Sequence, residues 1–503
     1  MNRVSTSIVF VTAFLAIVPG KLLAQNSPLM AGAAKVDITN DTAGPAHGRL
    51  HVRALVLQHG DVSAVVVTLD VVAIGEIGHI KNDFLPAVRA AVSKDPGLAP
   101  TSLIVNASHC HGTPCSDVVD RTVQAIRKAF SRLEPVTVGV GTGYEDRIME
   151  NRRLELKDGT VIDVRHAYSM PRDEDVVAVG PIDPEIGVLR LNRLNGTPLA
   201  VVYNFACHPI QGVPSGANTA DITGFSSEVI EDNLGDGVVA LFVQGCGGDI
   251  NPAFYKATDL PRDAEPLGNM LGLSTLKALR KIECGPVSQL KVHNETIALP
   301  RADLTERISF MEDKRKRLVQ SLRGTTLNLK SFLPLVMKYR LDVDYPSYYS
   351  HSYLNEEKLG RRNLRKLDEN NQRAMDQYIQ NIQTMEQLTR LQTNLKLLEK
   401  HQAHFAAAGK RTIDVEVCAL RIGDFRLITF PGELTVPIGL HLKQVSPHEH
   451  TFIAGYSNGY IYYCPTAEQL KNVGNAQEDS DCLLAPEWQK IFEDKAVSML
   501  ESL

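Results

Sequence analysis

A long helical stretch interrupts two strand-rich parts of this 503-residue chain and limits the folds open to it. Residues 303–410 are rich in Lys, Arg, Glu, Gln and Leu, and two apolar-periodic runs, 305–322 and 354–405, predict helices. The aromatic, non-periodic tract at 345–353 predicts a loop between them. Because strand patterns resume afterwards, we expect one sheet-containing domain with a helical insertion near 303–410. A coiled-coil arm is the alternative, although the heptad pattern is not sustained.

Apolar and β-branched segments on both sides of this stretch predict a sheet. Residues 54–58 and 63–70 are separated by His-Gly-Asp and indicate a hairpin. Further strands are expected at 31–39, 102–107, 136–140, 186–191, 199–205, 238–243, 415–422, 426–430 and 451–454, and helices at 81–93, 117–132, 221–233 and 486–500. Strands that alternate with helices predict a mixed α/β (α+β) fold, in which helices flank a mixed β-sheet.

The first 24 residues have the pattern of a secretory signal peptide. Arg3 precedes a short uncharged apolar run at 8–18, and Leu-Leu-Ala24 ends in the small residue that signal peptidases prefer. We therefore expect cleavage near Ala24 and a secreted or periplasmic protein, with an uncleaved membrane anchor as the alternative. The run is short for a bilayer span, and no later segment is apolar enough to be transmembrane.

Net charge limits the possible binding partners, and the cysteine spacing limits the possible disulfide bonds. A net charge of −5 implies no strong field of either sign, which argues against nucleic acid as a partner. The eight cysteines form no CxxC pair and match no small disulfide scaffold. In an exported protein they could be bridged. Free, buried cysteines are equally compatible with the spacing.

Two histidine motifs lie directly after predicted strands. In Asn106-Ala-Ser-His109-Cys-His111-Gly-Thr-Pro, both imidazoles fall in a loop at a sheet edge. In Asn-Phe-Ala-Cys-His208-Pro, another strand ends in a histidine and a helix breaker. Imidazole nitrogen is a common zinc ligand, so both motifs are candidate metal sites. Ordinary polar loop residues are the alternative for each motif taken alone.

Three further segments carry polar side chains at the ends of predicted strands. Glu433 follows Pro-Gly after 426–430, where it could be a metal ligand or a helix-terminal glutamate. Asp249 and Asn251 follow a glycine cluster that permits close backbone approach, although a tight turn would explain them too. Tyr460 and Tyr463 lie in an aromatic segment that could simply pack. Two histidines and one glutamate form a known ligand set for catalytic zinc, with an open position for water.

In order along the chain, these motifs resemble the neutral/alkaline (non-lysosomal) ceramidase family. The resemblance covers about residues 30–470 and is weakest across the helical stretch. It implies a zinc ion bound by His109, His208, Glu433 and Tyr463. It also implies that His111 is a general acid/base or a partner of the transition state. Arg152, which follows an asparagine as in the family, could hold a carboxylate, a hydroxyl or an oxyanion.

Three departures separate this chain from the family pattern. Asn251 stands where ceramidases carry a serine, so the same acyl-enzyme cannot form, although an amide can still donate to an oxyanion. Residues 472–477 lack the second tyrosine that the family has after its ligand tyrosine. The sequence after residue 470 is too short for the family's C-terminal immunoglobulin-like domain, so we expect a single ceramidase-like catalytic domain at 25–503.

The leading hypothesis is an exported zinc-dependent hydrolase in which metal-activated water attacks an amide (N-acyl) or related bond. His111 would carry a proton to the leaving group, and Arg152, Tyr460 or Asn251 would stabilise developing charge. The substrate would be a small or lipid-like molecule. A true ceramidase and a non-catalytic binding protein on the same scaffold are the competing hypotheses. A long apolar groove would favour a lipid, whereas a short polar pocket would favour a smaller or sugar-like substrate.

Overall fold

The computed structural model describes residues 27–95, 97–164, 171–253, 255–257, 259–341 and 351–503. The predicted signal peptide at 1–24 lies outside the described residues, as does most of the predicted loop at 345–353. Within the described residues the fold is mixed α/β, which confirms the fold class predicted from the sequence.

The first half of the chain is mainly strands with a few helices between them, and the segment from residue 301 to residue 411 is mainly helical. The strands are β1 (Met30–Asp37), β2 (His51–His59), β3 (Val62–Leu69), β4 (Leu103–Ala107), β5 (Glu134–Tyr144), β6 (Met149–Asn151), β7 (Arg153–Leu156), β8 (Val161–Asp163), β9 (Val176–Val179), β10 (Glu185–Arg193), β11 (Pro198–Phe205), β12 (Val239–Gln244), β13 (Ile250–Pro252), β14 (Leu290–Pro300), β15 (Thr412–Ile422), β16 (Phe425–Thr429), β17 (Glu433–Leu434), β18 (Thr451–Ala454) and β19 (Tyr463–Cys464). The helices are α1 (Phe84–Val92), α2 (Val118–Phe130), α3 (Asp221–Leu234), α4 (Glu265–Leu279), α5 (Thr305–Ser321), α6 (Leu329–Leu341), α7 (His351–Lys358), α8 (Asn363–Ala408), α9 (Val436–Val445), α10 (Gln477–Ser480) and α11 (Trp488–Ser502).

The largest sheet has eight strands in the order β12-β11-β10-β5-β1-β2-β3-β4. Its central pairs are antiparallel, while β3–β4 and β11–β12 are parallel pairs, each connected by a crossover that contains a helix. The sheet bends so that β12 contacts β2, β3 and β4. As a result, the carboxyl ends of β4 and β11, which carry the two histidine motifs, come close to each other.

A second sheet, β14-β15-β16-β18, packs against one face of the first. The side chains of β15 alternate: Cys418 and Leu420 face the large sheet, whereas Val417 and Ala419 face α11. Helices α1 to α4 cover the other face of the large sheet, so the body has four layers, helix–sheet–sheet–helix. Gly187 on β10 makes the sheets' close approach possible, because a Cβ there would lie 2.2 Å from the ring of Phe452.

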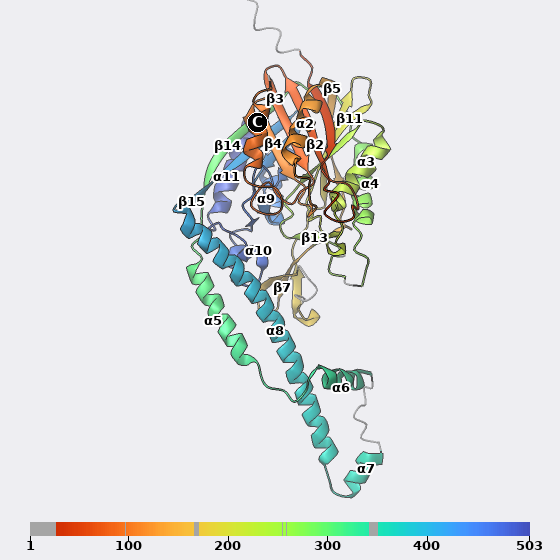
Figure 1. The fold of residues 1–503 in the computed structure, drawn as a ribbon, viewed down its shortest axis with the longest axis vertical. Coiled ribbons are helices and arrows are strands. Elements are labelled where there is room, and N and C mark those ends of the chain that lie inside the picture. The colour runs from red at the N-terminus through yellow and green to blue at the C-terminus, as the bar shows by residue number, and fades with distance from the viewer. Residues whose placement is uncertain (1–26, 96, 165–170, 254, 258, 342–350) are drawn as a thin grey trace, which may run out of the picture.

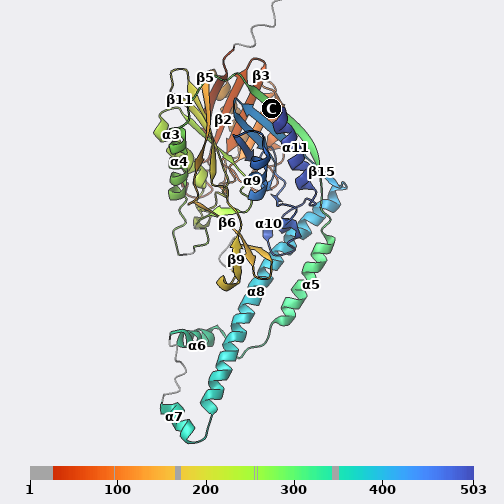
Figure 2. The same cartoon turned by 180° about the vertical axis from the view of Figure 1, so that it is seen from behind.

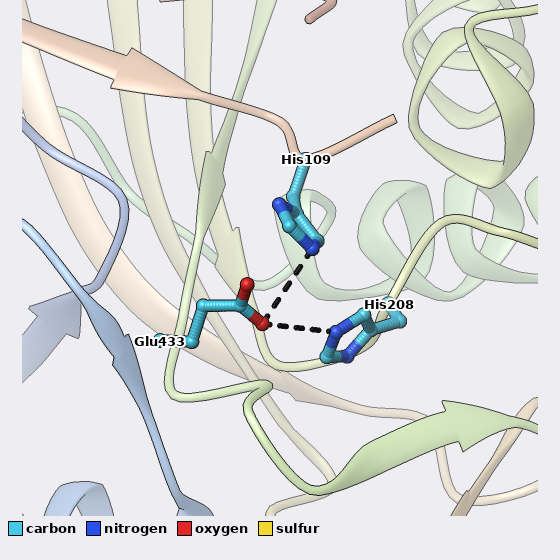
Figure 3. A group of neighbouring side chains, drawn as sticks. All are labelled: His109, His208 and Glu433. Carbon is cyan, nitrogen blue, oxygen red and sulfur yellow. Dashed lines mark hydrogen bonds and ion pairs between the residues drawn. The ribbon is translucent and has the colours of Figure 1, made fainter. Parts of the chain in front are cut away.

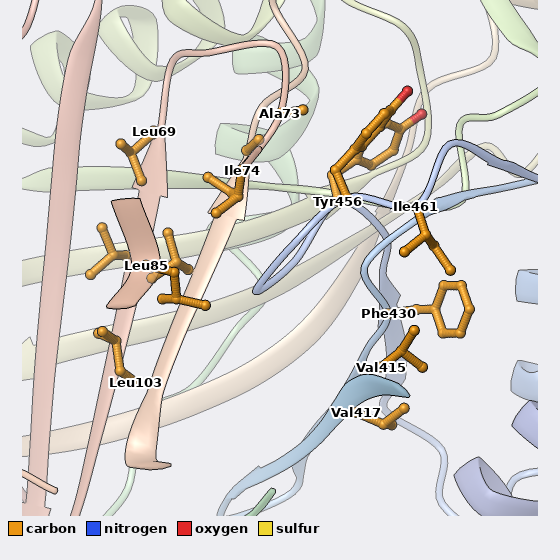
Figure 4. Packing of buried hydrophobic residues seen from close by; sticks show 14 of the residues in the cluster. Leu69, Ala73, Ile74, Leu85, Leu103, Val415, Val417, Phe430, Tyr456 and Ile461 are labelled. Atoms are coloured by element: carbon orange, nitrogen blue, oxygen red, sulfur yellow. The ribbon is translucent and has the colours of Figure 1, made fainter. Parts of the chain in front are cut away.

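The apolar core continues around the end of the second sheet. Figure 4 shows Leu69 and Leu103 of the large sheet on one side and Val415, Val417 and Phe430 on the other, with Tyr456 and Ile461 from the segment between them. This cluster therefore anchors residues 456–461 between the two sheets and fixes the aromatic segment that the sequence placed near the candidate site.

The predicted helical insertion is present as an arm, which we define as α5 to α8. It leaves the body after β14 and returns at β15, and these strands pair over their whole length, from Leu290 opposite Ile422 to Pro300 opposite Thr412. Figures 1 and 2 show α8 running from the body outward, with α5 alongside its proximal half and α6 and α7 near its distal end. No helix in the described part of the chain is both long and apolar enough to cross a membrane.

The arm differs from the prediction in two respects. The expected helix at 354–405 is two helices, α7 and α8, because the chain turns at Gly360, whose φ is +65°. Residues 351–353, expected in a loop, begin α7. Helix α6 was not predicted, since Pro334 lies inside it and proline normally opposes a helix interior.

Candidate metal centre

The ends of three strands and one turn are tied together at the candidate site. Asn106, at the end of β4, accepts a hydrogen bond from the backbone N–H of Gln244 on β12 at 2.9 Å. Its amide donates to the carbonyl of Gly455 at 2.7 Å. On β11, Asn204 donates to carbonyls of β12 and β18. These buried side chains hold the loops that follow β4, β11 and β18 in a fixed arrangement.

His109, His208 and Glu433 converge in this arrangement, and all three are buried. His109 follows β4 with a φ of +67°, His208 follows β11, and Glu433 begins β17. The Oε2 atom of Glu433 lies 3.1 Å from Nε2 of His208 and 3.6 Å from Nε2 of His109 (Figure 3). The three ligand atoms lie within 4.8 Å of one another, so a single metal ion could contact all of them.

Backbone carbonyls determine the tautomer of both histidines. Nδ1 of His109 lies 2.6 Å from the carbonyl oxygen of Val72, and Nδ1 of His208 lies 3.0 Å from that of Ile250. Because a carbonyl oxygen only accepts, each Nδ1 carries the proton and donates. In the neutral rings each Nε2 therefore presents its lone pair to Glu433. Metal-binding histidines usually donate their other ring N–H to a carbonyl or carboxylate in this way.

The surroundings of His109 and Glu433 lower the pKa of both side chains, for different reasons. Burial lowers the pKa of His109 to about 4. Burial tends to raise the pKa of Glu433, but the nearby His109 and His208 lower it more, so its pKa lies below the usual value. With both rings neutral, two imidazole nitrogens and a carboxylate oxygen face one another in a buried space. A cation resolves this repulsion, and two imidazoles with one carboxylate suit zinc.

Two tyrosines donate to Glu433. The hydroxyl of Tyr456 lies 3.2 Å from Oε2, and that of Tyr460 makes a short hydrogen bond to Oε1. Burial raises the pKa of both phenols well above the usual value, so they remain protonated donors. Tyr460 was a sequence-based candidate for stabilising charge on substrate; it lines the cavity, and its hydroxyl donates to Glu433. Tyr456 was not singled out from the sequence, where nothing distinguishes it from a packing aromatic.

Tyr463 lies beside the three ligands. Strand β19 pairs in parallel with β17 and places Tyr463 opposite Glu433. Its hydroxyl lies 3.4 Å from Nε2 of His208 and accepts a hydrogen bond from Nη2 of Arg152 at 3.2 Å. All four residues expected to hold the metal are therefore neighbours.

Arg152 is buried next to this group and is fixed by several contacts. Its guanidinium is ion-paired with the buried Glu478, and its Nη2 also donates to the carbonyl of Gly248 at 2.6 Å. Its Nη1 donates to Oδ1 of Asn251 at 3.1 Å. Asn251 is fully buried on β13 and is not among the residues that line the cavity described below. It therefore holds Arg152 rather than facing the space that a substrate would occupy.

A cavity of about 280 Å³ opens onto the candidate ligands. Only three of its fourteen lining side chains are aliphatic. The fourteen lining residues are Ile77, His109, His111, Arg152, His208, Ile210, Val213, Tyr255, Lys400, Glu433, Tyr460, Tyr462, Tyr463 and Asp481. His111 is exposed there, with its ring 5.4 Å from that of His109. The cavity is thus small and has the His111 imidazole next to the candidate metal ligands.

The arm supplies part of the cavity wall, which the sequence could not indicate. Lys400, near the end of α8, places its Nζ 4.1 Å from the ring centre of Tyr462. The neighbouring His401 makes a 2.7 Å contact between Nε2 and Oδ1 of Asp481, which also lines the cavity. The proximal half of the arm is therefore part of the site, whereas its distal half is remote from it.

Comparison with known proteins identifies the fold. No family model matches this sequence, and no curated protein does. Among solved structures, the neutral ceramidase from Pseudomonas aeruginosa superimposes with a TM-score of 0.59 at 17% identity, over 95% of this chain and 75% of that chain. A ceramidase complexed with C2 gives the same TM-score at 16% identity, over 95% of this chain and 76% of that chain. The chain has a neutral ceramidase-like fold, which confirms the resemblance drawn from its motifs at the level of structure.

Proposed function

We propose that this protein is a zinc-dependent hydrolase that cleaves an amide (N-acyl) bond. One observation carries the proposal: two imidazole nitrogens and a carboxylate oxygen, all with lone pairs, converge within 4.8 Å at a cavity that also contains Arg152. His109, His208 and Glu433 would hold the zinc ion, with the hydroxyl of Tyr463 as a fourth ligand. When bound, the ion would lower the pKa of a coordinated water to about 7 and so supply a nucleophile at neutral pH.

The side chains around the ligands would handle the substrate. Arg152 presents a fixed positive charge next to Tyr463, where it would stabilise negative charge that develops on the acyl oxygen during attack. Glu478 and Asn251 hold its guanidinium from behind and act as positioning residues. His111 is exposed in the cavity, so one of its ring nitrogens would deliver a proton to the leaving amine.

The volume and lining of the cavity limit the class of substrate that fits. Its volume of about 280 Å³ lies just below the usual range for ligand sites, roughly 300–1,000 Å³. Its lining combines histidine, aromatic and charged side chains with three aliphatic ones. These properties favour an N-acyl compound whose amide and polar head lie inside the cavity, with a short acyl chain. A true ceramidase is the second candidate, favoured by the solved ceramidase structures with the same fold. Release of fatty acid from ceramide, compared with release from short N-acyl amines, separates the two.

The test measures bound metal and turnover together. The variant His109→Asn suits the left-handed backbone at this position better than alanine would. We expect it to lose both bound zinc, measured by plasma mass spectrometry, and hydrolysis. His441→Ala, on the surface side of α9, is the matched histidine control and should keep both. Unchanged zinc content in His109→Asn would overturn the proposed metal site.

Two further outcomes test other parts of the proposal. Full zinc occupancy without activity on a broad panel of amides, esters and glycosides would favour a binding protein on the ceramidase-like scaffold. Export is also part of the proposal, because residues 1–24 have the pattern of a secretory signal. N-terminal sequencing of the protein made by cells should find Gln25 as the first residue, and an intact Met1 would refute processing there.

A further inference from the structure

Helix α6, on the distal half of the arm, has two apolar faces. One face packs on α8: Phe332 is buried, and its ring stacks on Tyr378 with centroids 4.4 Å apart. The other face points away from α8 and is exposed. It consists of four residues, 58%, 50%, 58% and 80% accessible in chain order: Leu329, Leu333, Met337 and Leu341. We call these four residues the outer stripe.

The spacing of the outer stripe makes it continuous. Its members are four residues apart, so at 3.6 residues per turn they occupy a sector of about 120° along the whole helix. Phe332, which packs on α8, falls outside this sector. An apolar surface of this length on a projecting arm is unusual for a water-exposed helix, since such helices normally present polar residues outward.

Positive charge accompanies the outer stripe. Lys330, Lys338 and Arg340 are exposed on α6, and the helix contains no Asp or Glu. On the same helical wheel Lys330 and Arg340 fall within the sector of the stripe, and Lys338 lies about 60° beyond its edge. Among the described residues these three cations form no ion pair. The whole chain has a net charge of −5, so the excess of positive charge on α6 departs from the average of the sequence.

These properties select one kind of partner. A second copy of the chain would bring two sets of cations together if the stripes paired with each other, and the like charges would oppose the contact. An anionic lipid surface has the opposite charge and accepts apolar side chains at the boundary between headgroups and acyl chains. Lysine and arginine side chains can reach the headgroups while their neighbours on the helix enter that boundary.

We propose that the outer stripe of α6 and its three cations dock the arm on an anionic lipid bilayer. The helix lies in the plane of the interface, with Leu329, Leu333, Met337 and Leu341 inserted and the cations at headgroup level. The body of the protein remains in water. This inference does not rest on the proposed catalytic function, because it uses only the surface of α6.

Sedimentation with vesicles tests the docking. The full mature chain is mixed with vesicles of phosphatidylcholine alone or of phosphatidylcholine with phosphatidylglycerol. We expect binding to the anionic vesicles, weakened by salt, and little binding to the neutral ones. A triple variant, K330E/K338E/R340E, should bind more than 100-fold less tightly, since each cation near an anionic surface contributes about fivefold. Its control, K277E/R280E/K281E, makes the same charge change on the body and should bind like the unmodified chain.

A second pair of variants tests the apolar part. L329Q/L333Q/M337Q/L341Q should lose vesicle binding, whereas L194Q/L273Q, at exposed leucines of the body, should keep it. Thermal unfolding and zinc content should match the unmodified chain in all four variants, because every altered side chain is exposed and remote from the cavity. Equal binding by arm and body variants, or no binding by the unmodified chain, would overturn the proposal. So would a dimer, detected by analytical ultracentrifugation, that the stripe variant dissolves without any vesicle binding.

Discussion

The hydroxyl of Tyr456 is the most informative single atom to remove from the site. It donates to Oε2 of Glu433 at 3.2 Å, and Oε2 is the oxygen that faces both histidines. Tyr456→Phe deletes this donor and keeps the ring, which packs against His109 with centroids 4.4 Å apart. The substitution also keeps the backbone hydrogen bonds that fix residue 456, from its N–H to Gly432 and from Ala107 to its carbonyl.

The expected magnitude follows from the chemistry of this contact. A hydrogen bond to a charged acceptor contributes about 1.5–3 kcal/mol. If that contribution orients Glu433 toward the metal, its loss weakens zinc binding by about 10- to 100-fold, the range typical of outer-shell partners of metal ligands. Glu433 stays ionised in the variant, because His109, His208 and the hydroxyl of Tyr460 still lower its pKa. Zinc binding is therefore weakened, and it is not abolished.

Competition with a fluorescent chelator measures the zinc affinity. Tyr203→Phe is the control, since its buried hydroxyl contacts Ser226 and Ser227 at 2.7 and 2.8 Å, away from the candidate ligands. The control should lose stability of a similar order and keep its zinc affinity. Wild-type zinc affinity in Tyr456→Phe would refute the idea that this hydroxyl supports the metal site. An equal loss of affinity in both variants would mean that general destabilisation, and not orientation of Glu433, is responsible.

Three other predictions concern pH and the residues behind the site. Burial lowers the pKa of His109 to about 4, so as the pH falls the unfolded chain binds this proton before the folded chain does. Chelator-treated protein should therefore lose up to about 3 kcal/mol of unfolding free energy between about pH 6.5 and about pH 4. Denaturant curves of His109→Asn should not show that loss. Glu478→Gln breaks the buried ion pair with Arg152 and should lower the free energy of unfolding in urea by about 3 kcal/mol. It should also lower kcat and leave the zinc content unchanged. An unaltered kcat would show that Arg152 does not need Glu478 to hold it. In the loop after His208, the N–H of Gly212 donates to Oδ2 of Asp221 at 2.7 Å, and Asp221→Asn places an amide N–H₂ near that N–H. We expect the free energy of unfolding to fall by about 1–3 kcal/mol and zinc binding to weaken. An unchanged zinc affinity would exclude any link between this loop and the metal site.

The sequence predicted the sheet elements well because most core strands are short apolar runs bounded by turn residues. It predicted the strands that carry His109 and His208 and the histidines at their ends. The structure brings these two residues, Glu433 and Tyr463 together, as the family resemblance implied. That they could meet depends on the bending of the eight-stranded sheet, which strand patterns in a sequence do not reveal.

Long-range contacts account for what the sequence did not indicate. Asn251 seemed able to contact substrate, but its partner is Arg152, which lies on a segment a hundred residues earlier in the chain. Glu478 and Tyr456 have no local pattern that marks them, because each acquires its role from a neighbour that the fold supplies. Lys400 reaches the cavity only because the proximal arm packs beside α10, a contact between segments with no shared periodicity.

The pairing of β14 with β15 has a consequence for how proteins of this shape can diversify. Pro300 and Thr412 stand opposite each other at the end of the ladder, so the whole of α5 to α8 is inserted at what would otherwise be a hairpin turn. Lengthening, shortening or exchanging the inserted helices leaves the register of both strands unchanged, because loop closure depends only weakly on loop length. Evolution, or an engineer, could therefore change the part of the cavity lining that comes from α8, and the distal half of the arm, through this single insertion point. The sheet that carries the candidate metal ligands would be unaffected.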